Sequence, residues 1–164
     1  MPIAPEIIER ADQQYAAIKA NVPIQGLAGL GPRLGEVFDW IAARGIAPAG
    51  PPFFKYNVID MEHELQMEAG VPVAAVVDGD DAIVTGVLPG GRYVTLTHTG
   101  HPDGLAAVTG ELLDWAENRD LKWDTDETSG NERWVSRLEF YLTDPSEQPD
   151  MNKWQTQLAF RLAD

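Results

Sequence analysis

Residues 38–46 read FDWIAARGI, and residues 113–121 read LDWAENRDL. Both stretches place an apolar residue before an Asp-Trp pair and then continue with a helix-like pattern. Trp40 and Trp115 are 115 − 40 = 75 positions apart in a chain of 164 residues. An internal match at about half the chain length predicts that the protein is built from two similar halves.

Each half contains one helix-like segment between strand-like runs. Apolar residues at helical spacing predict helices within 33–44 and 103–119, and Gly45 is a suitable residue to end the first. The other runs alternate in polarity or are rich in β-branched and aromatic residues, as half-buried strands are. In chain order they are YAAIKANVPIQGLA, PPFFKYNVID and HELQMEAGVPVAAVV in the first half, and IVTGVLPGGRYVTLTHTG, RWVSRLEFYLTDP and NKWQTQLAFRLAD in the second.

The order strand, helix, strand, strand in both halves predicts an α+β fold. We expect one domain over residues 1–164, with pseudo-repeats at approximately 14–77 and 82–162 that meet at the acidic loop VVDGDDAIV. The two small sheets either join edge to edge or pack as a pair. In both arrangements the face without helices must be shielded or must serve as a binding surface.

Composition and charge narrow the function classes. The chain has no cysteine, which excludes thiolate catalysis and cysteine-based zinc sites. Its formal net charge of −14 opposes nucleic-acid binding, because phosphate contacts need a basic surface. The N-terminus lacks the pattern of a signal peptide, and no window approaches the ~20 apolar residues of a membrane-spanning helix. We therefore expect a cytoplasmic protein that binds neither nucleic acid nor membrane.

Four stretches, taken in order and together with the repeat, resemble one known family. They are EAGVPV before the central loop, VLPGGRYVTLTHTG, LEFYLTDP and KWQTQLAFRL. Over roughly residues 14–162 the chain is similar to the GyrI-like small-molecule-binding domain. The resemblance implies two pseudo-symmetric β-α-β-β modules that form a curved antiparallel sheet, with two helices on one face and a ligand groove on the other.

The resemblance also bears on the ligand and on domain organisation. It implies a groove for hydrophobic, often cationic or planar molecules, and a glutamate at the position of Glu139 that pairs with cationic ligands. Only about a dozen residues precede the first strand. We therefore expect a stand-alone member without a DNA-binding domain. The loop HTGHPDGL also lacks the Gly-Pro-Tyr that many members have after the histidine turn.

Glu139 lies in a strand whose neighbours are mostly apolar. Because side chains alternate between faces, Leu138 and Phe140 share one face, which we expect to pack on the helices. Glu139 and Tyr141 then point to the helix-free face, where the groove is expected. The alternative is an ion pair between Glu139 and a neighbouring base such as Arg137 on a solvated face.

The repeat supplies partners for this carboxylate. If Tyr56 corresponds to Tyr141, then Phe54 corresponds to Glu139, and both strands contribute to one surface. Aromatic rings offer flat apolar walls and cation–π attraction, while one partly buried carboxylate selects for positive charge. Core packing is the alternative for Trp134 and Tyr93, and the face of Glu68 depends on one residue of register. The predicted ligand-binding residues are Glu139, Tyr141, Phe54, Tyr56, Tyr93, Trp134 and Glu68.

Two other motifs predict no site. His98 and His101 form an H-x-x-H pattern close to Asp103, but they lie in a turn, and a zinc site normally needs three protein ligands with rigid spacing. GLGPRLG opens a helix after a strand, yet its proline and its lack of further basic residues disfavour a phosphate site. We expect no metal and no cofactor.

Three functions remain open. The leading hypothesis is a stand-alone protein that binds amphipathic or cationic, drug-like molecules. The family resemblance also admits a hydrolase of cyclopropane-containing or similar electrophiles, in which Glu139, alone or with Tyr141, acts as general acid or base. The third is protein–protein inhibition of a DNA-acting enzyme, because one family member antagonises DNA gyrase, although no residue spacing identifies such a partner here.

Overall fold

The structure is a computed structural model that describes residues 4–23, 26, 29–60, 64–76, 78–126, 132–144 and 146–163. Its α-helices are α1 (Leu34–Ala43) and α2 (Leu105–Glu117). Its strands are β1 (Glu6–Arg10), β2 (Gln13–Val22), β3 (Phe53–Ile59), β4 (Leu65–Pro72), β5 (Val84–Leu88), β6 (Gly91–Thr99), β7 (Thr125–Asp126), β8 (Glu132–Trp134), β9 (Arg137–Tyr141) and β10 (Gln155–Arg161). The prediction of an α+β fold is confirmed. None of the helices in these ranges is long and apolar enough to cross a membrane.

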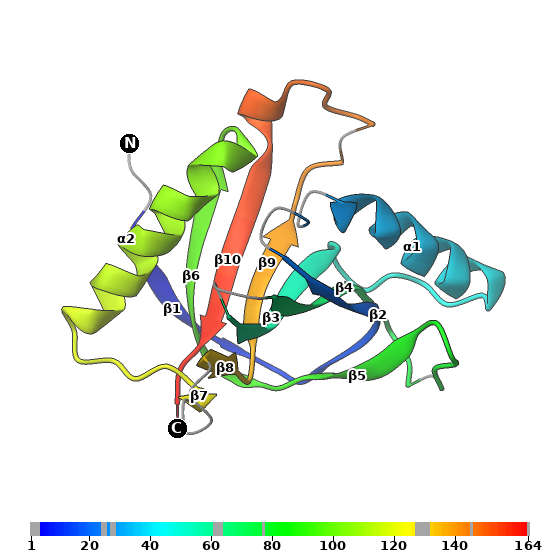
Figure 1. Cartoon of the computed structure of the whole chain (residues 1–164), viewed down its shortest axis with the longest axis horizontal. Coiled ribbons are helices and arrows are strands. Elements are labelled where there is room, and N and C mark those ends of the chain that lie inside the picture. Colours follow the sequence, from blue (N-terminus) through cyan, green and yellow to red (C-terminus); the bar gives the residue numbers. More distant parts are fainter. Residues whose placement is uncertain are drawn as a thin grey trace.

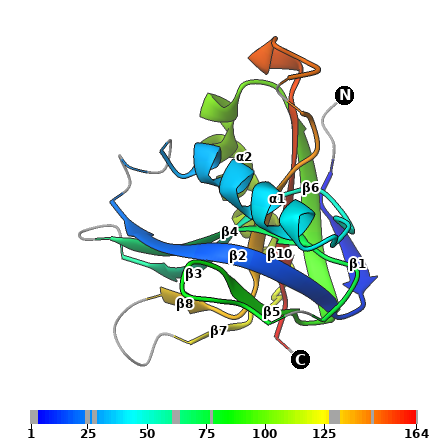
Figure 2. The same cartoon turned by 90° about the vertical axis from the view of Figure 1, so that its right-hand side faces the viewer.

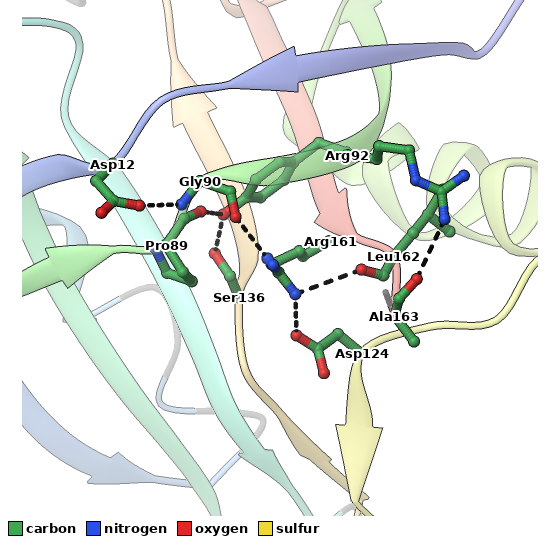
Figure 3. A network of polar contacts seen from close by, with 10 residues as sticks. Asp12, Pro89, Gly90, Arg92, Asp124, Ser136, Arg161, Leu162 and Ala163 are labelled. Carbon is green, nitrogen blue, oxygen red and sulfur yellow. Dashed lines mark hydrogen bonds and ion pairs between the residues drawn. The ribbon is translucent and has the colours of Figure 1, made fainter.

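The strands form one antiparallel sheet that curls strongly. Its order is β1-β6-β10-β9-β3-β4-β2-β5, and β8 extends it beside β3. β1 and β5 stand at opposite ends of this order, yet β1 leads directly into β2 and β5 into β6. The two links meet where the Gly90 N–H donates a 2.6 Å hydrogen bond to the Asp12 carboxylate (Figure 3). The ends of the sheet therefore approach each other, and the curl is visible in Figures 1 and 2.

Further contacts hold this corner of the sheet together (Figure 3). Arg161, at the end of β10, donates to the Gly90 carbonyl at 3.0 Å and pairs with the carboxylate of Asp124. The hydroxyl of Tyr93 donates to the Pro89 carbonyl at 2.6 Å, and the residue is only 1% exposed. Both the ring and the hydroxyl of Tyr93 are therefore used by the fold itself.

Both helices lie on one face of the sheet, called the helix face from here on (Figure 2). Val37 and Ile41 of α1 pack against β2 and β4, while Leu112 of α2 packs against β6 and β10. The strands β9 and β10 pass between the two helices (Figure 1). The sheet residues in these contacts are Ala16, Ile18 and Val71 under α1, and Val94, Leu96, Leu158 and Phe160 under α2.

The repeated sequence ends the two helices in the same way. Gly45 (φ 67°) and Asp120 (φ 57°) hold equivalent positions in the repeat, and both adopt the left-handed conformation that commonly closes a helix. Arg44 and Arg119 each stack on the tryptophan four residues earlier, with 3.8 and 4.0 Å from the guanidinium carbon to the ring centroid. The internal match in the sequence therefore corresponds to a shared local structure.

The opposite face of the sheet, called the inner face, carries an apolar core of its own. Phe53 lies edge-on to both Tyr15 and Phe140, with ring centroids 5.5 and 5.6 Å apart. Gly70 is required there, because a Cβ at this position would lie 2.8 Å from the Phe53 ring. The buried members of this inner core are Tyr15, Ala17, Phe53, Leu88, Tyr93, Leu138, Phe140 and Ala159.

The inner core corrects one expectation about β9. Leu138 and Phe140 do share a face, but they pack in the inner core and not on the helices. Glu139 is paired with Leu158 of β10, which contacts Leu112 of α2, so Glu139 lies on the helix face. The expectation was wrong because β9 is buried on both faces. Alternation separates two faces correctly, but it does not say which of two apolar faces meets the helices.

Candidate functional site

Two phenols hold the carboxylate of Glu139 in the middle of β9. Tyr56 of β3 donates to Oε2 at 2.9 Å, and Tyr141 donates to Oε1 at 2.8 Å. Phe54 is directly opposite Glu139 in the register between β3 and β9, and it packs edge-on against the Tyr141 ring at 5.0 Å. The four residues that sequence analysis grouped therefore lie together, on the helix face of the sheet.

Apolar side chains surround this group. Glu139 is only 8% exposed, whereas Tyr56 and Tyr141 are half-buried. Leu30, just before α1, and Leu34, the first residue of α1, pack over the same part of the sheet. A molecule that reaches the carboxylate must therefore contact aromatic and aliphatic surface. The other apolar members of the cluster are Phe54, Leu65, Met67 and Ala69.

Burial dominates the electrostatics of the group. It raises the pKa of Glu139, and this rise is opposed by the hydrogen bonds from Tyr141 and Tyr56 and by the positive charge of Arg137. Burial, followed by the charge of Glu139, raises the pKa values of Tyr56 and Tyr141 well above the ordinary value of tyrosine. Both phenols therefore stay protonated and act as hydrogen-bond donors to the carboxylate.

The ion pairs of the described residues leave Glu139 without a cationic partner. Arg33, Arg44, Lys55, Arg137 and Arg161 pair with other carboxylates, and no basic side chain of the described residues is within ion-pair distance of Glu139. A buried carboxylate is normally paired with a cation as well as hydrogen-bonded, because desolvating its charge is costly. Arg137 acts on Glu139 only through space, so this group lacks a cation in direct contact with the carboxylate.

The second buried carboxylate of the sheet has a different environment. Glu68 of β4 accepts hydrogen bonds from the Tyr15 hydroxyl (2.6 Å) and from Asn57 Nδ2 (2.7 Å). Its Oε2 also lies 3.5 Å from the ammonium nitrogen of Lys55, which is itself buried. Its charge is therefore balanced within the protein. Tyr15 belongs to the inner core, so Glu68 lies on the face opposite Glu139.

The structure thus divides the predicted residues into two groups. Glu139, Tyr141, Phe54 and Tyr56 lie together, and Trp134 of β8 lies near them on the helix face, where it packs with Phe160. Tyr93 and Glu68 lie on the inner face and do not join this group. Knowing that Tyr93 and Glu68 lie in strands was not enough to predict their face, because the register between strands of the curled sheet decides it.

Sequence analysis did not assign Arg137 to the site. Its guanidinium carbon lies 5.4 Å from the Tyr56 ring centroid, and Tyr56 also binds Glu139. The alternation of side chains along a strand could have indicated it, because Arg137 and Glu139 are two residues apart on β9 and so share a face. The same pattern is equally typical of a basic residue that forms an ion pair at the surface.

His98 lies at the end of β6, and His101 lies in the turn before α2. His98 Nε2 is 3.0 Å from the carbonyl oxygen of His101, and His101 Nδ1 accepts the N–H of Asp103. No group of three metal-ligating side chains occurs in the part of the chain that the structure describes.

Comparisons with known proteins identify the family and the fold. A family model described as the GyrI-like small molecule binding domain matches residues 3–163. The chain belongs to the GyrI-like family. No curated protein sequence matches the chain.

Several solved structures share this GyrI-like fold at low sequence identity. The C-terminal domain of EcmrR is 20% identical, with a TM-score of 0.77, and the match covers 100% of this chain and 99% of that domain. In the EcmrR–DNA complex, the present chain spans only 59% of the EcmrR chain, with a TM-score of 0.79 and 20% identity. At this identity the likeness shows the fold alone.

Two further structures with the GyrI-like fold carry functional descriptions of their own. SAV2435, solved bound to tetraphenylphosphonium, is 12% identical with a TM-score of 0.66, and the match covers 98% of this chain and 94% of that one. A protein from Listeria innocua described as a hydrolase is 14% identical with a TM-score of 0.60, and the match covers 97% of this chain and 91% of that one.

Proposed function

We propose that this GyrI-like domain binds hydrophobic small molecules that carry a positive charge, and that Glu139 recognises the charge. The observation that supports this most is the environment of the carboxylate. Glu139 is buried, its two oxygens accept hydrogen bonds from Tyr56 and Tyr141, and no basic side chain of the described residues pairs with it. A ligand cation supplies the direct ion pair that the carboxylate lacks.

The surrounding side chains suit a ligand with aromatic groups. The half-buried Tyr56 and Tyr141 carry aromatic rings that attract a cation, and Phe54 packs edge-on against the Tyr141 ring. Most small-molecule sites combine apolar walls with a few polar groups that set orientation. The structure of SAV2435 bound to tetraphenylphosphonium adds a chemical precedent on the same fold.

Calorimetry with two matched probes tests this function. Methyltriphenylphosphonium and triphenylphosphine oxide have nearly the same shape, but only the first is charged. We expect the cation to bind one site per chain, about 5-fold more tightly than the neutral oxide at about pH 8. The affinity for the cation should fall as the pH drops through the raised pKa of Glu139, because protonation removes the negative charge. Equal affinities at all pH values, or no binding of either probe, would refute the proposal.

Hydrolysis of a strained electrophile is a second candidate. It is favoured by the raised pKa of Glu139, because a carboxyl group shifted toward neutral pH is a better general acid. The same probe-binding protein is incubated with a cyclopropane-containing alkylating agent, and the products are followed by mass spectrometry. Ring-opened product formed over many turnovers supports catalysis, whereas binding without product leaves the protein a binder.

A further inference from the structure

Arg137 lies two residues before Glu139 on the same face of β9, inside a group of three aromatic rings. Its guanidinium carbon is 5.4 Å from the ring centroid of Tyr56, 4.9 Å from Trp134 and 4.5 Å from Phe160. These rings, here called the arginine cage, come from β3, β8 and β10. They surround the guanidinium as an aromatic cage surrounds a ligand cation.

Polar contacts contribute little to holding Arg137 in this cage. Its one ion pair, from Nη1 to Oε2 of Glu132, is long at 3.9 Å, and the Glu132 side chain is 38% exposed. Arg137 Nε and the indole N–H of Trp134 are both buried, and neither has a hydrogen-bond partner among the described residues. Buried donors are normally satisfied, so these two call for an explanation. The rings, and not hydrogen bonds, hold the guanidinium in place.

The arginine cage and the Glu139 site are directly connected. Tyr56 donates its hydroxyl to Glu139 while its ring contacts the guanidinium of Arg137. Residues two apart on a strand are about 7 Å apart, a distance at which charges still interact in a poorly solvated site. An arginine stays protonated even where burial lowers its pKa, as it does for Arg137. A fixed positive charge therefore stands beside the carboxylate that recognises the ligand.

We propose that Arg137 sets the charge selectivity of the Glu139 site by acting as a resident cation that occupies the arginine cage. This inference rests on the proposed function and names its ligand class more closely. Because Arg137 partly offsets the charge of Glu139, the wild-type site takes neutral aromatic molecules as well as singly charged aromatic cations. It excludes compact, highly charged polyamines, which would face Arg137 at short range.

The test compares the cation with the neutral probe in Arg137 variants. The selectivity ratio is the dissociation constant of triphenylphosphine oxide divided by that of methyltriphenylphosphonium. We expect Arg137→Met to raise this ratio about 10-fold, because the repulsion of the ligand cation is lost. Arg137→Lys keeps the charge without the flat stacking group, so its ratio should stay within about 3-fold of the wild type.

Arg10 provides a matched control. It also stacks on aromatic rings, at 4.7 Å from Phe140 and 5.7 Å from Tyr93, but on the inner face of the sheet. Arg10→Met removes the same charge from the protein, and we expect its selectivity ratio to stay within about 2-fold of the wild type. An equal rise in Arg10→Met and Arg137→Met would mean that net charge alone controls selectivity, and the proposal would fail.

A pH profile gives an independent readout. The charge of Arg137 helps to hold down the pKa of Glu139, so its removal should raise the pH at which cation binding is lost. If Arg137→Met does not fold, Arg137→Gln is measured in its place. A folded, uncharged variant with an unchanged ratio and an unchanged pH profile overturns the role of Arg137. If wild type and Glu139→Gln bind both probes equally, the proposed function itself has failed.

Discussion

Glu139→Gln should weaken the binding of methyltriphenylphosphonium at least about 30-fold, while the affinity for triphenylphosphine oxide changes less than about 3-fold. The substitution keeps the shape of the side chain but removes the only negative charge in the group that Tyr56 and Tyr141 form. It also leaves the charge of Arg137 unopposed beside the ligand. The neutral probe should then bind as well as the cation or better, which calorimetry measures directly.

The same variant should be more stable than the wild type at neutral and higher pH. The folded-state pKa of Glu139 is raised, so its favourable contribution is complete below the unfolded-state pKa and is lost as the pH rises through the folded-state value. Glu139→Gln avoids that loss. We expect a gain of about 1 kcal/mol in unfolding free energy at about pH 8, which disappears in acid. A binding site that costs stability is a common trade-off.

Glu68→Gln is the matched control for both readouts. Glu68 is also a buried carboxylate hydrogen-bonded to a tyrosine, but its charge balances Lys55 on the inner face. The substitution should leave the affinity for the cation unchanged and should lower stability, because Lys55 loses its partner. Loss of cation binding in Glu68→Gln, with retention in Glu139→Gln, would move the ligand site to the inner face.

Phe140→Ala should lower the unfolding free energy by about 3–5 kcal/mol in urea denaturation. Phe140 is 2% exposed and packs edge-on against Phe53 in the inner core. Truncation of its ring opens a cavity that the curled sheet cannot readily close. At a temperature where the variant stays folded, its affinity for the phosphonium probe should match the wild type, because the ring lies on the opposite face from Glu139.

Leu142→Ala is the control for Phe140→Ala. Leu142 follows β9 and is 42% exposed, so its truncation should cost less than about 0.5 kcal/mol. Similar losses in the two variants would show that Phe140 is not part of a packed core. A large drop in probe affinity in Phe140→Ala alone would show that the ligand contacts the inner face.

Sequence patterns predicted the two helices and the α+β class, but they missed β1 (Glu6–Arg10), which precedes the first expected strand. The repeat around Trp40 and Trp115 predicts two halves, and the left-handed residues Gly45 and Asp120 confirm that the matching stretches end two helices alike. The repeat also places Phe54 and Glu139 at corresponding positions, and in the structure these two residues are directly opposite each other on the paired strands β3 and β9. These features depend on local periodicity and on spacing along the chain, both of which the sequence contains.

The sequence was insufficient wherever the curl of the sheet decides the outcome. Residues of β9 such as Leu138 and Glu139 are buried on opposite faces, so polarity alone does not reveal which face meets the helices. Tyr93 was predicted to bind the ligand, yet its hydroxyl donates to the Pro89 carbonyl where the two ends of the curled sheet meet. The role of Arg137 depends on rings from three other strands, and no local pattern predicts that assembly.

The position of the ligand is the central claim, and the tyrosines allow one direct measurement of it. The chain has four tyrosines, and two lie on each face of the sheet: Tyr56 and Tyr141 beside Glu139, and Tyr15 and Tyr93 in the inner core. With tyrosine rings isotopically labelled, intermolecular nuclear Overhauser effects from the phenyl protons of methyltriphenylphosphonium identify the rings that it contacts. We predict contacts to Tyr56 and Tyr141 alone. Contacts to Tyr15 or Tyr93 without contacts to Tyr56 and Tyr141 would contradict the account.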